Sequence, residues 1–242
     1  MSRLPIQRPG SALVIAAWLS VGSATVAAQV PAAPPAAPKG APIEKLGPNL
    51  LRVGNVNVDT AKKEVSVKGV VNQVETLEFI VNPKGGAKAY ESAIEVDTDG
   101  VNFNVGLILI GLDPSHTKWP KRGDPPMLPN GDPVDIFVEW DEGTEKRRVR
   151  AEQLVYNEVT KTTLSEGPWV YTGSAFIPEA NAYLADLDGA LIGFVHRRAP
   201  VIDSPRPIPP GAYGANKLNP ALKLKAGTNV LVIVRALARD KQ

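Results

Sequence analysis

The sequence predicts an α+β fold, in which mainly antiparallel β-sheet hairpins pack around one principal α-helix in a single domain. The helix is predicted over residues 101–112. One face of it carries apolar residues at intervals that match a period of about 3.6: Val101, Val105, Ile108 and Leu112. Elsewhere valines alternate with polar residues, as in the segment 56–58, and this period of two is typical of strands with one buried face. Together the two patterns predict strands that bury the apolar face of one helix.

The elements follow one another in a simple order. Hairpins are predicted from residues 56–58 with 65–67, from 77–81 with 90–96, and from 134–140 with 146–150. The helix follows the second hairpin; Asp97 and Asp99 are expected to cap it, and Gly111 or Asp113-Pro114 to end it. A short helix is expected from residue 151, and strands at 169–173, 183–186 and 190–196, the last two joined by an Asp188-Gly189 turn. The strand 230–234 is apolar throughout, which predicts a place near the centre of a sheet.

Composition excludes several classes of function. The chain has 242 residues, no cysteine and a formal charge of +2. Without cysteine there is no disulfide, thiol nucleophile, cysteine-bound zinc or iron–sulfur cluster. The first 28 residues hold two of the 27 bases and no acid, so the remainder carries 25 bases and 25 acids. That balance gives no electrostatic reason to expect nucleic acid as a partner.

The N-terminal part predicts export from a bacterial cell. Residues 1–28 have the features of a secretory signal peptide: Arg3 and Arg8, an apolar centre at 12–19, and the small residues 26–28 at the cleavage site. Residues 29–48, rich in Pro and Ala, are predicted to be a linker, and residues 49–242 the folded domain. We therefore expect a periplasmic or secreted protein with no stable membrane span after cleavage of the signal. An uncleaved anchor is the alternative, although the apolar centre is short for it.

Several motifs resemble one family of exported bacterial proteins. They lie between about Leu51 and Val234: the Val-Asn-Val-Asp-Thr sequence at 56–60, the segment 85–92, the helix end at 109–112, the Val-Glu-Trp strand at 138–140, and the segments 169–174 and 185–189. On these motifs the chain resembles the YdjY-like domain family. The resemblance implies an exported protein and no particular activity. Relatives tend to have His before Glu-Ser, where this chain has Tyr90.

The candidate binding residues are Glu91, Ser92, Trp169 and Tyr171. Trp169 and Tyr171, with Trp140, are expected to anchor the core between sheet and helix. If one side of Trp169 and Tyr171 stays exposed beside Glu91, these aromatic residues would line a shallow groove. Glu91 with Glu139 would form a general acid/base pair if the two met across a cleft. No catalytic residue is assigned, because no Gly-x-Ser-x-Gly motif surrounds Ser92.

No metal or cofactor is expected. His116 and His196 are the two histidines, and a hydrolytic zinc site needs a third protein ligand, such as Glu91. Asp97-Thr98-Asp99-Gly100 and Asp186-Leu187-Asp188-Gly189 resemble the start of a calcium loop but lack its later ligands. We expect a helix cap at the first and a hairpin turn at the second.

Two functions follow from these patterns. The preferred hypothesis is an exported, non-catalytic binding or interaction module whose partner is an envelope protein or a small ligand. The alternative is a carboxylate-dependent hydrolase of the envelope that uses Glu91, Ser92 and Glu139.

Overall fold

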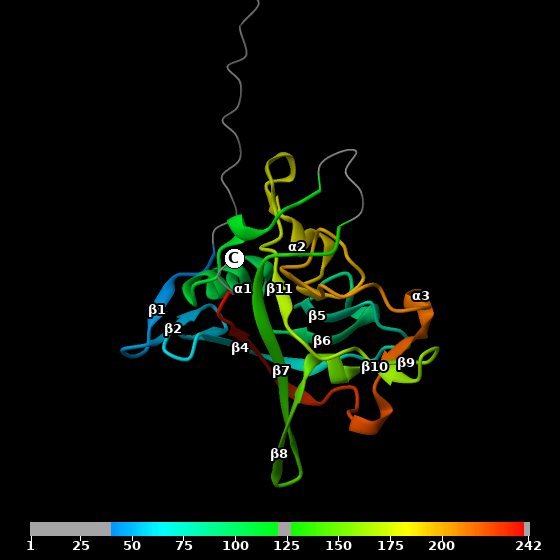
Figure 1. The fold of residues 1–242 in the computed structure, drawn as a ribbon. Helices are drawn as coiled ribbons and strands as arrows, with labels where there is room; N and C mark the ends of the chain where they lie inside the picture. Colours follow the sequence, from blue (N-terminus) through cyan, green and yellow to red (C-terminus); the bar gives the residue numbers. More distant parts are fainter. Residues whose placement is uncertain (1–39, 121–126, 240–242) are drawn as a thin grey trace, which may run out of the picture. The chain divides into compact units, whose positions relative to one another are not determined.

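The fold is organised around a closed β-barrel of eight strands, in a computed structural model that describes residues 40–120 and 127–239. Around the barrel the order is β4, β17, β7, β11, β15, β14, β5 and β6, and β6 pairs with β4 again (Figure 1). The predicted α+β arrangement around one principal helix is therefore wrong, because the chain is mostly β. The barrel strands are β4 (Glu64–Val71), β5 (Phe79–Pro83), β6 (Ser92–Val96), β7 (Asp132–Glu142), β11 (Trp169–Tyr171), β14 (Ile192–Gly193), β15 (Ile202–Asp203) and β17 (Asn229–Ala236).

Shorter elements extend the barrel. The other strands are β1 (Ile43–Lys45), β2 (Leu50–Val53) and β3 (Val56–Asp59), which follow one another outward from β4; β8 (Glu145–Arg150), which pairs with β7; β9 (Val155–Asn157), β10 (Thr162–Thr163) and β16 (Asn216–Leu218) in a small sheet; and β12 (Phe176–Ile177) with β13 (Ala182–Tyr183). The helices are α1 (Gly100–Leu109), α2 (Leu184–Asp188) and α3 (Ala212–Ala215). Short 3-10 turns are η1 (Ala89–Glu91), η2 (Pro114–His116), η3 (Ala151–Leu154), η4 (Pro178–Ala180) and η5 (Pro220–Leu222).

The barrel closes because β4 serves two neighbours along one edge. Its first residues pair with β3, as in Ser66 with Asn57, and its last residues pair with β6, as in Gly69 with Val96. Its other edge pairs with β17 along its whole length. A Cβ atom on Gly69 would lie 2.6 Å from the backbone oxygen of Glu95, so only glycine fits where β6 joins β4.

The local predictions are largely confirmed. β3–β4 and β7–β8 are antiparallel hairpins, β17 lies between β4 and β7, and a 3-10 turn stands where the short helix was expected. α1 begins after Asp99, whose side chain accepts a hydrogen bond from the backbone N–H of Asn102. These features depend on neighbours in sequence, which periodicity and capping residues report directly.

Two predicted hairpins are wrong. β5 and β6 are parallel rather than a hairpin, because η1 carries the chain back before β6 begins. The hairpin predicted from 183–186 with 190–196 is instead β13, helix α2 and the two-residue strand β14. Gly189 does turn the chain, but as the left-handed residue (φ 75°) that ends α2.

α1 buries a different face from the one predicted. Phe103, Leu107 and Gly106 are buried, whereas Ile108 is 44% exposed. α1 packs against β2 and β3, where a Cβ atom on Gly106 would lie 2.9 Å from Val56. The face of α1 that approaches β3 at Gly106 also carries Phe103 and Leu107, and both side chains are buried in the core.

Part of the predicted N-terminal organisation can be compared with the structure. Residues 43–45, inside the predicted linker, form β1 and pair with β2, so paired structure starts earlier than residue 49. The predicted signal peptide 1–28 and residues 29–39 lie outside the described residues. No helix within 40–120 or 127–239 has the length and apolar character that crossing a membrane requires.

Candidate functional site

The outer face of β4, β17 and β7 carries a broad hollow. Strand alternation sends Val65, Val67 and Val71 of β4 and the valines of β17 inward and leaves the residues between them outside. On that outer face Lys68 lies opposite Leu231, and Leu231 lies opposite Glu139. One step along, Ser66, Ile233 and Phe137 are aligned in the same way. The first row is therefore polar, apolar and polar across the three strands, and the second continues the apolar centre from Ile233 to Phe137.

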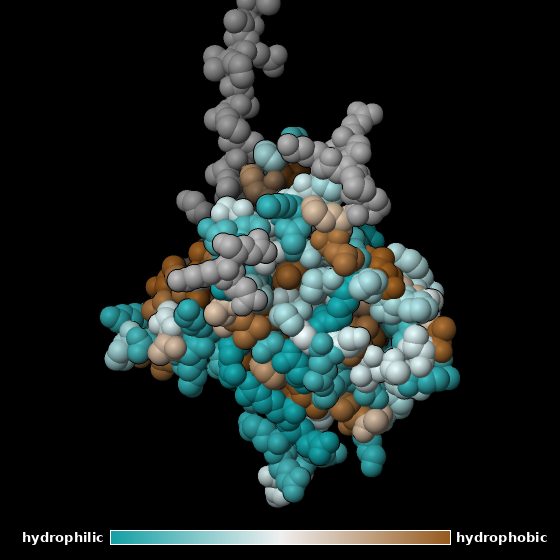
Figure 2. Space-filling view, in the orientation of Figure 1, coloured by the Kyte–Doolittle hydropathy of each residue, from teal (hydrophilic) through white to brown (hydrophobic). Residues whose placement is uncertain are grey.

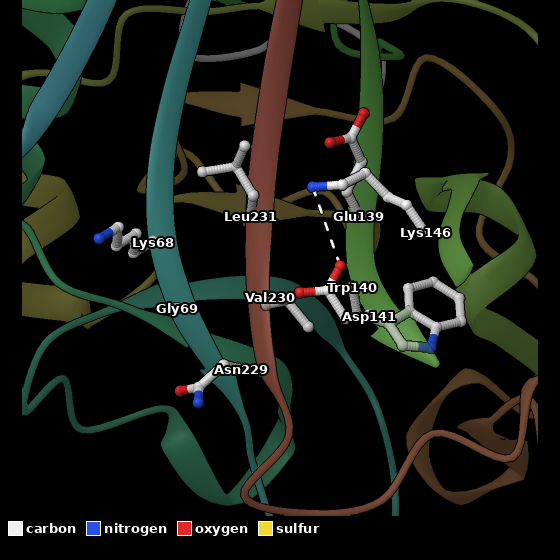
Figure 3. A pocket seen from close by; sticks show the side chains of 9 residues that line it. All are labelled: Lys68, Gly69, Glu139, Trp140, Asp141, Lys146, Asn229, Val230 and Leu231. Atoms are coloured by element: carbon white, nitrogen blue, oxygen red, sulfur yellow. Dashed lines mark ion pairs between the residues drawn. The ribbon is translucent and has the colours of Figure 1, made fainter. Parts of the chain in front are cut away.

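The hollow has a volume of about 500 Å³ and is open to solvent (Figure 3). Its lining comes from three strands and the β7–β8 ribbon: Lys68, Gly69, Glu139, Trp140, Asp141, Lys146, Asn229, Val230 and Leu231. It shares Lys68, Gly69 and Asn229 with a second hollow of about 290 Å³, and Leu231 with a third of about 400 Å³ beside β2 and β3. The three hollows adjoin one another at these shared residues, and together we call them the outer-face groove.

The walls of the outer-face groove carry charges that are mostly paired. Arg148 donates to Glu139 at 3.1 Å, Lys146 lies 3.9 Å from Asp141, and Arg235 donates to Glu64 at 2.7 Å. These basic side chains therefore do not make a cationic surface, although β8 is rich in Lys and Arg. The β7–β8 ribbon stands out as a hydrophilic arm (Figure 2). Between the paired charges, Leu231 and Ile233 provide an apolar floor.

The predicted aromatic residues are in the core. Trp169 and Tyr171 are fully buried, so they line no exposed groove beside Glu91. The Tyr171 hydroxyl donates a hydrogen bond of 2.6 Å to the side-chain oxygen of Asn104 on α1. Burial, with the nearby carboxylates of Asp113 and Asp132, raises the pKa of Tyr171. Tyr171 thus ties the barrel wall to the helix as a neutral phenol.

Glu91 ends η1 and Ser92 begins β6, and both contact Lys88. The Glu91 carboxylate is buried and lies 2.6 Å from the Lys88 ammonium, while the Ser92 hydroxyl donates to the Lys88 backbone oxygen at 2.7 Å. Glu139 lines the outer-face groove, and Glu91 does not. The carboxylate pair that the hydrolase hypothesis requires is thus divided between two separate ion pairs.

Each histidine lies beside a buried aspartate. His116 Nδ1 is 2.8 Å from Asp132, and His196 Nδ1 is 3.7 Å from Asp203. Asp132 pairs with Tyr171 across one edge of β11, and Asp203 pairs with Val170 across its other edge. Because Val170 and Tyr171 point to opposite faces of the sheet, the two aspartates do so as well. In the described part of the chain, there is no group of three or more His, Asp or Glu side chains that could hold a metal ion.

The two acidic motifs meet at the start of α1. Asp99 caps the helix as predicted, and Asp186 accepts a second hydrogen bond from the backbone N–H of Gly100. The predicted hairpin turn at Asp186 is wrong, because Asp186 belongs to helix α2. Asp97 accepts from Lys84 and Asn55 instead.

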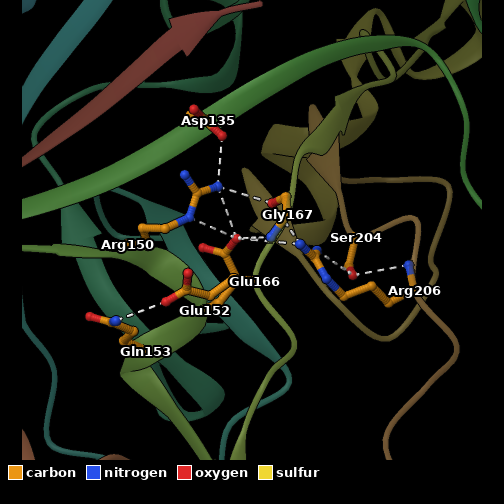
Figure 4. Close-up of polar contacts among 8 residues, drawn as sticks. All are labelled: Asp135, Arg150, Glu152, Gln153, Glu166, Gly167, Ser204 and Arg206. Carbon is orange, nitrogen blue, oxygen red and sulfur yellow. Dashed lines mark hydrogen bonds and ion pairs between the residues drawn. The ribbon is translucent and has the colours of Figure 1, made fainter.

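A buried ionic network was not foreseen from the sequence (Figure 4). Glu152 is fully buried, and its carboxylate lies 3.1 Å from Arg150 and 3.3 Å from Arg206. It also accepts a hydrogen bond of 3.0 Å from the Gly167 backbone, and Arg150 reaches on to Asp135. The network fastens η3 to β7 and to the segment that follows β15.

A comparison with protein families finds a match between residues 56–234 and the YdjY domain. The chain belongs to the YdjY domain family. The matched region runs from the first residue of β3 into β17, so the strands that close the barrel all begin within the YdjY domain. Comparisons with curated proteins and with solved structures find no match.

Proposed function

We propose that this YdjY domain is an exported, non-catalytic binding module that holds an extended segment of a partner protein of the cell envelope in the outer-face groove. The observation that carries the proposal is the groove itself. It runs along β17 and β4 and joins three hollows. The eight residues of β17 span about 26 Å at a rise of about 3.3 Å per residue. That length suits several residues of an extended chain better than one small molecule.

The chemistry of the outer-face groove fits a peptide of mixed character. Leu231 and Ile233 offer apolar contact along the floor. Glu139, Asp141 and Lys146 place both signs of charge along one wall. A partner segment with alternating apolar and polar residues would place its apolar side chains on this floor and its polar groups along the walls.

The test compares capture of partner proteins by the wild-type chain and by groove variants. Leu231→Arg and Ile233→Arg place a charge on the apolar floor and are expected to abolish capture of the main partner. Val159→Arg is the matched control, because Val159 is 62% exposed and lines no part of the groove. Equal capture by all four proteins would contradict the proposal.

Export is part of the proposal and has its own test. The support for it is the signal-peptide pattern in residues 1–28. Intact-mass measurement of chain recovered from outside the cytoplasm is expected to show a protein that begins near Gln29. Recovery of the chain with Met1 retained would contradict cleavage.

A further inference from the structure

A second, smaller cavity lies near the end of β11, away from the outer-face groove. Its volume is about 100 Å³. One wall is formed by residues 117–120 and 127–130, the other by residues 196–198, and Thr172 lies between them. We call it the His196 pocket.

The walls of the His196 pocket are held by hydrogen bonds. The Asn130 side chain accepts from the backbone N–H of Lys118 at 2.7 Å and donates to its oxygen at 2.9 Å, which joins the two halves of the first wall. The Thr172 hydroxyl donates to the backbone oxygen of Pro200 at 2.7 Å and so anchors the second wall. The cavity is therefore preformed.

The lining has one sign of charge. Lys118, Arg197 and Arg198 contribute three cations, and the described lining residues include no Asp or Glu. Arg197 is paired with Asp188 at 3.1 Å. The Arg198 guanidinium carbon lies over the Trp119 ring, 5.0 Å from the ring centre, which is a cation–π contact. The cavity is thus a local excess of positive charge.

His196 is held in an unusual state. Its backbone has φ +55°, a left-handed conformation that a histidine adopts at a cost and that is often found at functional sites. Neither ring nitrogen has a hydrogen-bond partner among the described residues, and neither is exposed. Behind it lies Asp203, which is 1% exposed and has an unpartnered Oδ2 atom.

The remaining lining is apolar and limits the size of a ligand. Trp119, Met127 and Leu128 line the cavity together with prolines. A water molecule occupies about 30 Å³ and benzene fits a cavity of about 150 Å³, so the His196 pocket admits a molecule between these sizes. We propose that it binds a short-chain aliphatic carboxylate, with the carboxylate at Arg198 and the alkyl tail against Met127 and Leu128.

The test is an NMR titration of the full chain with sodium propionate, referenced to sodium chloride at the same ionic strength. The expected result is a saturable shift of the Trp119 indole N–H and of backbone amides in 117–118 and 196–198, with a Kd on the order of 1 mM because so small a ligand makes few contacts. No saturable shift, or shifts centred elsewhere, would overturn the proposal.

Variants separate specific from general electrostatic binding. Arg198→Gln is expected to weaken propionate binding at least about tenfold, and Lys118→Gln by a smaller factor, each with an unchanged spectrum outside the pocket. Both side chains are exposed, so neither change removes core packing. Lys225→Gln, an exposed cation outside the cavity, is the control and should change nothing. Equal weakening by all three variants, or tighter binding of inorganic phosphate than of propionate, would overturn the proposal.

Discussion

The carboxylate of Asp186 accepts a hydrogen bond of 2.5 Å from the backbone N–H of Gly100, which lies 86 residues earlier in the chain. Asp99 satisfies the N–H of Asn102 at 2.7 Å, so α1 is capped both by its own N-cap residue and by another helix. Asp186 therefore joins α2 to the start of α1. This contact makes the position of α1 depend on the fold of the second half of the chain.

Removing this cap should destabilise the protein. Asp186→Ala is expected to lower the free energy of unfolding by about 1–2 kcal/mol, because a half-buried backbone N–H loses its acceptor. Urea denaturation measures the change. Asp141→Ala is the control, since its side chain is 78% exposed in a 3.9 Å ion pair, and it should cost less than about 0.5 kcal/mol. Equal effects of the two changes would show that the cap carries no stability.

Closure of the barrel can be tested at Gly69. Gly69→Ala brings a Cβ atom to 2.6 Å from the Glu95 backbone oxygen, so β4 and β6 must separate. The expected loss is about 1–3 kcal/mol, with faster hydrogen exchange at the N–H of Asn72 and of Asp97, which bond across this seam. Gly47→Ala is the control, because its Cβ would meet only ordinary contacts at 3.7 Å. Unchanged exchange in Gly69→Ala would argue against the closed barrel.

The buried carboxylate of Glu152 should be needed for folding. Glu152→Gln leaves Arg150 and Arg206 without the charge that both contact, and is expected to cost about 2–4 kcal/mol. The expected loss of stability is smaller than for a fully buried ion pair, because the Arg150 and Arg206 side chains are 22% and 17% exposed. Glu166→Gln, an exposed neighbour that accepts a hydrogen bond from Gln153, should be close to neutral. Thermal denaturation of both variants measures these changes. Equal losses in the two would show that the Glu152 carboxylate is not needed for stability.

The buried Asp203 predicts a pH dependence of stability. Burial raises the pKa of its carboxyl above the ordinary 3.8, and the nearby His196 opposes this less strongly. The folded chain therefore keeps this proton to a higher pH than the unfolded chain, and its stability falls as the pH rises from 3.8 through the raised pKa. Asp203→Asn cannot titrate. The stability of Asp203→Asn relative to wild type should therefore increase with pH across that interval, as measured by denaturation at several pH values; a decrease would contradict the shift.

The sequence predicted elements whose signals are local. Period-two alternation predicted β3, β4 and β7, an unbroken apolar run predicted β17, and capping residues predicted the start of α1. Pairings between distant segments have no such signal. β14 and β15 have two residues each, too few for any periodicity, yet they complete the barrel. The close approach at Gly69 that seals it became visible only in three dimensions.

The candidate site was predicted less well than the fold. The sequence indicated Glu91 and Trp169 as candidate binding residues. In the structure Glu91 lies in a buried ion pair and Trp169 lies in the core. The outer-face groove instead uses the exposed positions of ordinary alternating strands, such as Lys68 and Leu231. These residues become a site only when β4, β17 and β7 are set side by side, and no single strand reveals that order.

The central claim is that the outer-face groove holds a partner segment. The most direct measurement is site-specific photo-crosslinking in cells that produce the full chain, with the photoreactive residue at position 231 or, as control, at position 159. The account predicts a discrete crosslinked adduct from position 231 that is absent from position 159. No adduct at 231, or the same adducts from both positions, would contradict it.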